Sequence, residues 1–313
     1  MSKPKVYIDG KEGTTGLQIY QRLGERQDIE LLLIDEDKRK DPAERKKFLN
    51  AADLVFLCLP DAAAVEAVDM IENPGTKVID ASTAHRTAQG WVYGFAEVLP
   101  GQRQRIAASS RVANPGCHAT GFLATAAPLV DLGVLPRDYP LSCYSLTGYS
   151  GGGKKLIAEY EAPDRDPRLA SPAPYSLGMS HKHLPEMKAV AGLACPPNFL
   201  PVLGDIYKGM ATCVMLQNRL LTGTPGAQDI RDLLEGYYQG EALVKVAPFG
   251  GSGPRLYTNE LAGKDCLEIT VSGNEEQTLL CAQFDNLGKG ASGAAVQNMN
   301  IMLGFEETRG LSL

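Results

Sequence analysis

The first half of the chain alternates short apolar runs with stretches in which apolar residues recur at helical spacing. The runs cover Lys5–Ile8 and residues 29–34, 53–59 and 76–80. Helical spacing is found over Thr14–Leu23 and again after Pro60. Nearly continuous apolar runs are typical of parallel strands that are covered on both faces. The pattern therefore predicts an α/β fold with a Rossmann-type, doubly wound parallel sheet.

The pattern changes near residue 118. A helix is expected over 118–132, and after it longer strands of antiparallel character mix with Pro-rich loops and with a helix near 226–239. This mixture predicts a second domain of α+β type, over residues 118–285. We expect residues 1–117 to form the first domain, joined by the C-terminal segment 286–313.

Composition narrows the classes of partner. The 313 residues carry a formal net charge of -6, which disfavours binding to nucleic acid and to anionic membranes. The basic run Lys38–Lys40 and its neighbour Arg45–Lys47 are local exceptions. No run approaches the length of a membrane span, and the first residues lack a signal-peptide core, so we expect a cytoplasmic protein.

Cysteine usage singles out one residue. The seven cysteines are scattered without the spacing of a metal site, and most lie in apolar runs, so we expect buried thiols and no bound metal. Cys117 differs because Asn, Pro, Gly and His surround it in the stretch VANPGCHATG. It stands between a Pro-Gly turn and the start of a helix, where the partial positive charge of the helix N-terminus favours a thiolate. Cys117 is therefore a candidate nucleophile.

A glycine-rich loop follows the first expected strand and opens a helix. Its residues are Gly10, Lys11, Glu12, Gly13, Thr14, Thr15 and Gly16. Such a loop allows a pyrophosphate to approach the free backbone N–H groups of the helix. This context predicts a dinucleotide site.

The choice between NAD and NADP stays open at this stage. Asp35 ends the second expected strand, where an acidic side chain binds the ribose 2′-hydroxyl of NAD. Lys38, Arg39 and Lys40 follow at once, and basic groups there suit the 2′-phosphate of NADP. A solvated run of charges is an equally good interpretation.

The chain has four histidines, and two of them lie together in MSHKHLPEMK. His181 and His183 are followed by Glu186, and a histidine held by a carboxylate is a general acid/base. His85 and His118 are expected to be surface or core residues. We therefore expect the proton partner of Cys117 in this segment.

Two further segments suit a site that is built from loops. The run TGYSGGGKK includes Gly151, Gly152 and Lys154, and NLGKGASG places Lys289 and Gly290 before the last helix. The first segment suits a cofactor or an anion, with a flexible connection as the ordinary alternative. The second offers an anion the N-terminus of a helix.

In combination these motifs resemble the N-acetyl-gamma-glutamyl-phosphate reductases, in their shorter form, within the semialdehyde dehydrogenase group. The resemblance rests on GKEGTTG, NPGCHATG, TGYSGGGK, HKHLPE and NLGKGASGAAVQNMN, which follow in order between residue 5 and about residue 303. It implies an NADP-binding domain, a catalytic and dimerisation domain, and a C-terminal helix that returns to the first. The implied reaction is the NADPH-dependent reduction of N-acetylglutamyl 5-phosphate to the 5-semialdehyde and phosphate, in arginine biosynthesis.

The resemblance also assigns roles. It implies that Cys117 forms a thioester and that His183, or otherwise His181, is the acid/base with Glu186 as its orienting group. Arg86, Lys154, Lys182 and Asn114 become expected substrate contacts, and Ser82, Gly151, Gly152, Lys289 and Gly290 join the glycine loop and Asp35 as expected NADP(H) contacts.

Two other functions fit parts of this pattern. An aspartate-semialdehyde dehydrogenase would use the same chemistry on a shorter acyl phosphate, but its cysteine usually follows an asparagine directly. A catalytically silent dinucleotide sensor fits poorly with a cysteine that has a His/Glu partner. The expected partners are a small acyl phosphate, inorganic phosphate and further copies of the chain, as a dimer or a tetramer.

Overall fold

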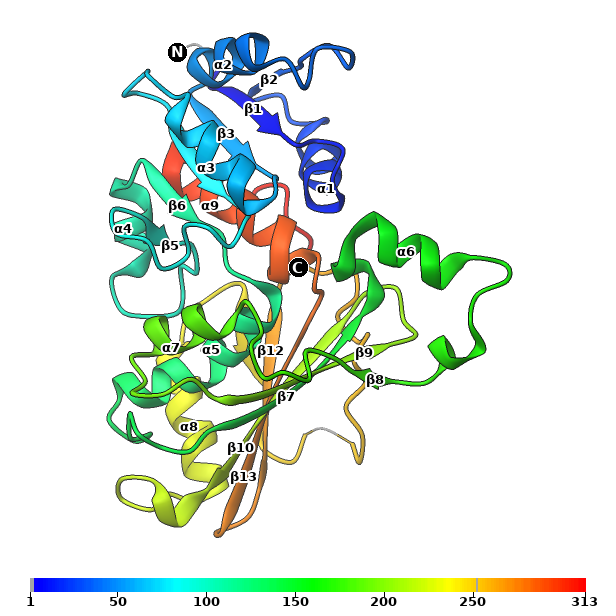
Figure 1. Cartoon of the computed structure of the whole chain (residues 1–313). Coiled ribbons are helices and arrows are strands. Elements are labelled where there is room, and N and C mark those ends of the chain that lie inside the picture. The colour runs from blue at the N-terminus through cyan, green and yellow to red at the C-terminus, as the bar shows by residue number, and fades with distance from the viewer. Residues whose placement is uncertain (1–2, 252) are drawn as a thin grey trace. The chain divides into compact units, whose positions relative to one another are not determined.

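The computed structural model describes residues 3–251 and 253–313 and divides into two compact units (Figure 1). The first unit comprises the chain up to Ala96, Gly101–Pro115 and Ala291–Leu311. The second comprises Glu97–Pro100, Gly116–Gly290 and Ser312–Leu313.

The first unit is built on a parallel sheet with the strand order β2-β1-β3-β4-β6-β5. Its strands are β1 (Lys5–Asp9), β2 (Glu30–Leu32), β3 (Leu54–Leu57), β4 (Lys77–Asp80), β5 (Val92–Tyr93) and β6 (Arg111–Ala113). Its helices are α1 (Thr14–Leu23), α2 (Pro42–Ala51), α3 (Asp61–Asp69), α4 (Gln102–Ala108) and α9 (Gly293–Leu303). The expected doubly wound parallel sheet is confirmed.

Two apolar cores explain why the strands are apolar on both faces. Side chains of β1 and β3 alternate between them, so that Val6 and Phe56 join one core and Tyr7 and Val55 join the other. The first core includes residues of α1, α4 and α9, and the second includes residues of α2 and α3. Leu17 of α1 is 39% exposed, so the buried stripe of this helix runs through Ile19 and Leu23.

The second unit contains a mixed sheet of order β11-β12-β13-β10-β7-β9-β8. Its strands are β7 (Ser142–Gly148), β8 (Ala173–Pro174), β9 (Asn198–Gly204), β10 (Met210–Gln217), β11 (Val244–Val246), β12 (Leu267–Gly273) and β13 (Gln277–Phe284). Its α-helices are α5 (Cys117–Asp131), α6 (Gly153–Glu161), α7 (Leu184–Ala191) and α8 (Ala227–Tyr237). Short 3-10 helices cover Tyr149–Gly152, Pro167–Ala170 and Asn218–Leu220, and a π-helical turn covers Gly288–Ser292. The expected α+β architecture is confirmed.

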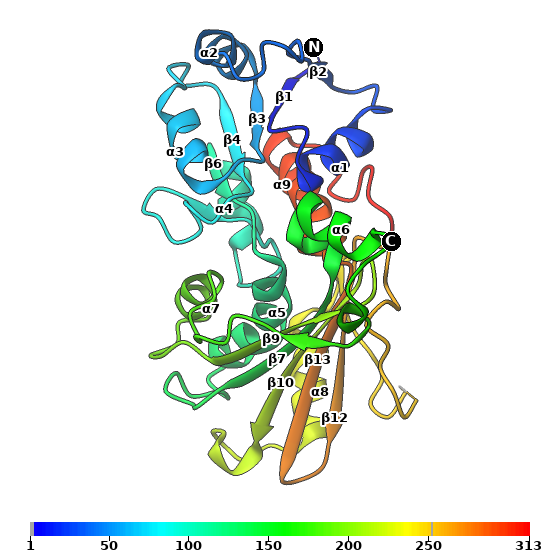
Figure 2. The same cartoon turned by 45° about the vertical axis from the view of Figure 1, so that its right-hand side comes forward.

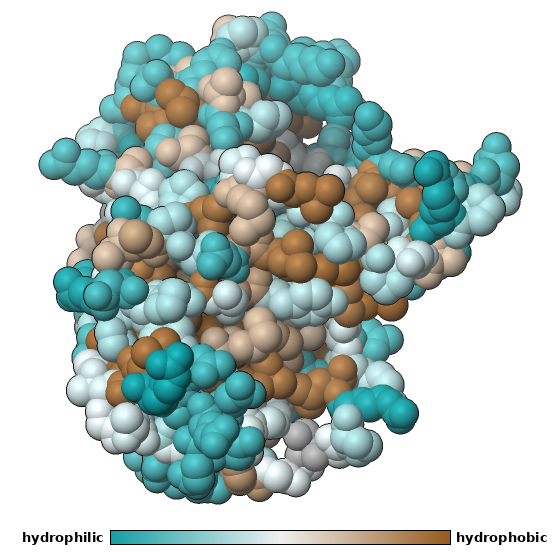
Figure 3. All heavy atoms as spheres, turned by 60° about the horizontal axis from the view of Figure 1, so that its bottom comes forward, coloured by the Kyte–Doolittle hydropathy of each residue, from teal (hydrophilic) through white to brown (hydrophobic). Residues whose placement is uncertain are grey.

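Helices α5 and α8 pack on this sheet, and α7 packs against α5 (Figures 1 and 2). Nearly all of α5 is buried. Along β10, Val214 and Leu216 are buried whereas Met215 between them is 47% exposed, because successive side chains point to opposite faces. Leu200 of β9 is exposed as well. Figure 3 shows apolar side chains grouped on the surface of the molecule.

No helix in the described ranges, 3–251 and 253–313, has the length and apolar character needed to cross a membrane.

Glu97 and Lys289 form a buried ion pair within the second unit. The ammonium of Lys289 lies 2.7 Å from a carboxylate oxygen of Glu97, and both side chains are at most 2% exposed. Removing one member of such a pair leaves a buried charge without its counterion, which is costly. Lys289 was expected among the cofactor contacts, but in the structure its ammonium forms an ion pair with Glu97.

We expect Lys289→Met to lower the free energy of unfolding by about 3 kcal/mol, because Glu97 would stay buried without its counterion. Urea unfolding followed by circular dichroism measures the change. The exposed pair Lys46–Glu72, with a distance of 2.6 Å, provides the control: Lys46→Met should cost less than about 1 kcal/mol. Equal losses in the two variants would contradict the assignment, and adding Glu97→Leu to Lys289→Met should restore part of the loss.

Candidate functional site

Cys117 is the first residue of α5, and Gly116 is the N-cap residue before it. The first N–H groups of a helix have no partner within the helix, so the positive end of the helix lies at the sulfur. The backbone passes very close on another side, since a Cβ added to Gly290 would lie 3.0 Å from the Cβ of Cys117. Gly290 therefore acts here by allowing this close approach. Cys117 itself is only partly buried.

Helix α7 brings the predicted acid/base segment to the same turn. Glu186 lies in the first turn of α7 and is 1% exposed, and its Oε2 accepts a hydrogen bond of 3.1 Å from the backbone N–H of Gly116. His183 is the N-cap residue of α7 and is also buried. Glu186 was expected to orient His183, and the structure shows it in contact with the cysteine turn.

Three histidine rings cluster next to Cys117. His118 follows Cys117 in α5, and its ring centre lies 5.4 Å from that of His181 and 5.6 Å from that of His183. The rings of His181 and His183 are 4.7 Å apart, edge to face, and Nδ1 of His181 accepts a hydrogen bond from the backbone N–H of His183. Tyr175 completes the cluster, with its hydroxyl 2.7 Å from Nε2 of His118. The structure therefore brings HKHLPE and NPGCHATG together.

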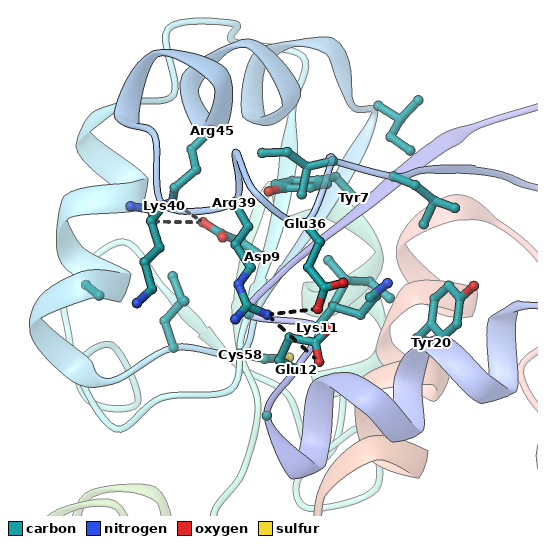
Figure 4. A pocket seen from close by; sticks show the side chains of 18 of the residues that line it. Tyr7, Asp9, Lys11, Glu12, Tyr20, Glu36, Arg39, Lys40, Arg45 and Cys58 are labelled. Atoms are coloured by element: carbon teal, nitrogen blue, oxygen red, sulfur yellow. Dashed lines mark hydrogen bonds and ion pairs between the residues drawn. The ribbon is translucent and has the colours of Figure 1, made fainter.

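A separate cavity of about 660 Å³ lies within the first unit (Figure 4). It opens where β1 and β3 end, with Gly10 and Gly13 on one side and Cys58 on another. In the order β2-β1-β3-β4, the connection after β1 leads to β2 on one side, and the connection after β3 leads to β4 on the other side. Ligands of open α/β sheets bind at such a switch point. Burial raises the pKa of the Cys58 thiol to about 12, so this cysteine stays protonated.

Glycine is required at two positions of the loop. Gly10 has φ of +85°, and a Cβ there would lie 2.4 Å from the carbonyl oxygen of Cys58. A Cβ on Gly16 would lie 2.4 Å from the carbonyl oxygen of Gly10. Thr14 begins α1, and Lys11 and Glu12 line the cavity. This tight turn at a helix N-terminus fits a pyrophosphate, as the sequence predicted.

Charged side chains line the cavity beyond β2. Arg39 and Lys40 are among them, and Figure 4 shows both beside the cavity. Arg39 lies 3.7 Å from Glu36 and 3.9 Å from Glu12, which are long contacts between exposed groups. Asp35 is not among the described lining residues; its carboxylate is exposed and lies 3.6 Å from the ammonium of Lys38. The side chain that was expected to contact the ribose is therefore exposed and lies beside Lys38.

Deeper in the cavity, Asp9 and Arg45 form a buried pair. Arg45 Nη2 donates to Asp9 at 2.9 Å, and the two side chains are 11% and 5% exposed. Burial raises the pKa of the neighbouring Tyr7 hydroxyl, and the charge of Asp9 adds to this effect. The pair holds together two side chains that line the cavity.

Ser82, Arg86 and Asn114, the expected contacts of the cofactor or the substrate, follow strands β4 and β6 in the first unit. Arg86 Nε donates to the carbonyl of Asn114 at 3.0 Å. The Asn114 amide donates to the carbonyl of Ala291 and accepts from Asn298, so it stabilises the fold. Ser82 donates to the buried carboxylate of Asp80, which also lies 2.6 Å from Nδ1 of His85.

The remaining expected residues lie in the second unit. Lys154 of α6 and Lys182 before α7 are exposed. Gly151 and Gly152 are exposed too, in the turn before α6, and the Ser150 hydroxyl in this turn accepts a hydrogen bond of 3.0 Å from Asn286. Lys154, Lys182, Gly151 and Gly152 are open to solvent, whereas Lys289 is buried against Glu97.

Sequence reasoning missed Tyr175, Ser145 and Thr212. Tyr175 lies in a Pro-rich segment, and the two hydroxyl residues lie in strands β7 and β10, so no local motif marks them. Only the pairing of β7 with β10 shows that Ser145 and Thr212 are neighbours.

Comparisons with known proteins cover both units. The family model "Semialdehyde dehydrogenase, NAD binding domain" matches residues 5–107, and "Semialdehyde dehydrogenase, dimerisation domain" matches residues 117–286. N-acetyl-gamma-glutamyl-phosphate reductase 2 of Nostoc sp. is 49% identical, over 99% of this chain and 100% of its own length. The protein of the same name from Pseudomonas putida is 48% identical, over 99% of this chain and 100% of its own length.

Solved structures show the same fold. Aspartate semialdehyde dehydrogenase II of Vibrio cholerae superimposes with a TM-score of 0.76 at 17% identity, covering 97% of this chain and 99% of its own. The aspartate semialdehyde dehydrogenase of Francisella tularensis gives 0.73 at 14% identity, covering 96% and 100%. At such low identity the likeness concerns the fold alone. With its family models and its near-full-length relatives, this chain belongs to the semialdehyde dehydrogenase family, among the N-acetyl-gamma-glutamyl-phosphate reductases.

Proposed function

We propose that this chain reduces N-acetylglutamyl 5-phosphate with NADPH to N-acetylglutamate 5-semialdehyde and inorganic phosphate, a step of arginine biosynthesis. The observation that carries this proposal is the identity of 48–49% across the whole of both chains with proteins named N-acetyl-gamma-glutamyl-phosphate reductase. We assign the cofactor to the first unit and covalent catalysis to the second.

Cys117 is the nucleophile of this proposal. Its thiolate attacks the acyl carbon, the C–S bond forms, and the bond from that carbon to the phosphate oxygen breaks as phosphate leaves. A covalent thioester divides one hard step into two easier ones. Backbone N–H groups in the first turn of α5 offer hydrogen bonds to the oxygen that becomes negative.

His183 is the proposed acid/base. It donates a proton to the oxygen of the hemithioacetal and then takes a proton back as the C–S bond breaks and the aldehyde forms. Glu186 is buried beside it in the first turn of α7 and fixes the cysteine turn through Gly116. His181, at an edge-to-face distance of 4.7 Å, is the alternative.

The cavity of the first unit is the proposed NADP(H) site. The glycine loop fits the pyrophosphate, since any side chain at Gly10 would strike the carbonyl of Cys58. Arg39 and Lys40 are the proposed contacts of the 2′-phosphate. When bound, the nicotinamide supplies the hydride that reduces the thioester.

Arg86, Lys154 and Lys182 stay proposed contacts for the phosphate and carboxylate of the substrate. The guanidinium of Arg86 is already oriented by the carbonyl of Asn114. We also propose that the chain works as a homo-oligomer in the cytoplasm. The exposed Met215 and Leu200 on the second sheet support this, since paired copies would cover them.

Cys117→Ser should lower kcat by more than about 1,000-fold, because the serine hydroxyl is a poor nucleophile without a thiolate. The assay follows NADPH formation from N-acetylglutamate semialdehyde, NADP and phosphate. Cys195→Ser is the matched control, since Cys195 is an exposed thiol outside the site. Near-normal activity of Cys117→Ser would refute covalent catalysis by this residue.

Arg39→Ala and Lys40→Ala should each raise KM for NADPH by about 10- to 100-fold and leave KM for NADH nearly unchanged. The reason is that only NADPH carries the 2′-phosphate. Lys38→Ala is the control, because Lys38 pairs with Asp35 and does not line the cavity. If both cofactors weaken equally, the 2′-phosphate assignment is wrong.

Substrate choice can be measured on the wild-type protein. We expect kcat/KM with N-acetylglutamate semialdehyde to exceed that with aspartate semialdehyde or glyceraldehyde 3-phosphate by at least about 100-fold, because a site built for polar groups rejects analogues that lack them. A preference for either competitor would overturn the substrate assignment.

A further inference from the structure

His118 has no role in the reaction described so far, yet both of its ring nitrogens are held in place. Nδ1 lies 2.8 Å from the Ser145 hydroxyl, and this hydroxyl lies 2.9 Å from that of Thr212. Nε2 lies 2.7 Å from the hydroxyl of Tyr175. His118, Ser145 and Thr212 are all at most 2% exposed. A row of four polar groups therefore runs from β10 through β7 and α5 to Tyr175.

The His118 ring is neutral. Burial, together with the positive charges of His181 and Lys182, lowers the pKa of His118 to about 3. The other titratable groups that face the ring are His183 and Tyr175. A neutral imidazole has one N–H donor and one acceptor, so His118 donates on one side and accepts on the other.

Tyr175 keeps its proton as well. Burial raises the pKa of its hydroxyl, and the charge of a Cys117 thiolate raises it further. The same electrostatics decides which way the row of hydrogen bonds runs. If Tyr175 donated to Nε2, its oxygen lone pairs would be left to face the thiolate. If Nε2–H donates to Tyr175, the phenol proton is free to point at the negative charge.

The backbone around Tyr175 is costly to form. Ser176 and Met179 have φ of +55° and +54°, which side chains other than glycine rarely adopt. The N–H of Tyr175 donates to the carbonyl of Pro201 at 3.0 Å, and the N–H of Met179 donates to the carbonyl of Ser176. Strain of this kind persists where the surrounding structure fixes a residue in one position.

We propose that His118 is a positioning residue: its Nε2–H, held by Ser145 and Thr212, orients the Tyr175 hydroxyl so that the phenol donates its proton toward negative charge at Cys117. This inference rests on the proposed function, in which Cys117 reacts as a thiolate. It predicts that Tyr175 stabilises the thiolate and that His118 acts through Tyr175.

The test compares two substitutions of His118. A glutamine amide can place a donor near the position of Nε2, whereas an asparagine amide reaches only toward Ser145 and leaves Tyr175 without its donor. The rate of alkylation of Cys117 by iodoacetamide is measured against pH, by mass spectrometry of the peptide that contains Cys117. Thermal unfolding is recorded for every variant.

We expect His118→Asn and Tyr175→Phe each to raise the pH midpoint of alkylation by about one unit and to lower kcat about tenfold. His118→Gln should recover most of both losses. The double variant His118→Asn/Tyr175→Phe should have the same kcat and the same pH midpoint as Tyr175→Phe alone, because His118 acts only through Tyr175. Tyr175→Phe removes only the hydroxyl and conserves the shape of the side chain, so it tests the inference even if His118→Asn folds poorly.

A Tyr175→Phe protein with the wild-type alkylation profile would overturn the inference, and so would losses that add in the double variant. Failure of the proposed function would be seen in a different measurement, the activity of Cys117→Ser. If this variant keeps its activity, the proposed function is wrong, whereas the alkylation profiles still report whether Tyr175 and His118 act on the sulfur.

Discussion

The start of helix α5 is the constraint on which the site depends. Strand β6 ends at Ala113, and Pro115 and Gly116 lead to Cys117, the first helical residue, so the sulfur lies where a helix offers partial positive charge. Glu186 holds this turn through the N–H of Gly116. The turn is thus fixed from a second helix, and a small shift of α7 would move the backbone next to the nucleophile.

Strand order likewise explains the cavity of the first unit. The connection after β1 leads to β2 and the connection after β3 leads to β4 on the opposite side, and the cavity lies at the carboxyl ends of β1 and β3. Gly10 brings the loop against Cys58, and the basic residues Arg39 and Lys40 follow from the segment after β2. The cavity is therefore a consequence of strand order, and its charge depends on one short loop.

Much of this could be predicted from local patterns. Strands covered on both faces have apolar runs, and a Pro-Gly turn marks a helix start, so the sequence predicts both the parallel sheet and the place of Cys117 at the start of α5. Other features depend on contacts between distant segments. Asp35 has the spacing of a ribose contact, but only the structure shows that its exposed carboxylate lies beside Lys38. Lys289 lies before a helix in the sequence, yet its ammonium forms an ion pair with Glu97, 192 residues away.

The central claim is that Cys117 carries the acyl group as a thioester. Its most direct test is mass spectrometry of the protein after incubation with N-acetylglutamate semialdehyde and NADP in the absence of phosphate, followed by an acid quench. Our account predicts an N-acetylglutamyl adduct on the peptide that contains Cys117, which disappears when phosphate is added before the quench. An adduct on another residue, or turnover with no adduct on the cysteine under these conditions, would contradict it.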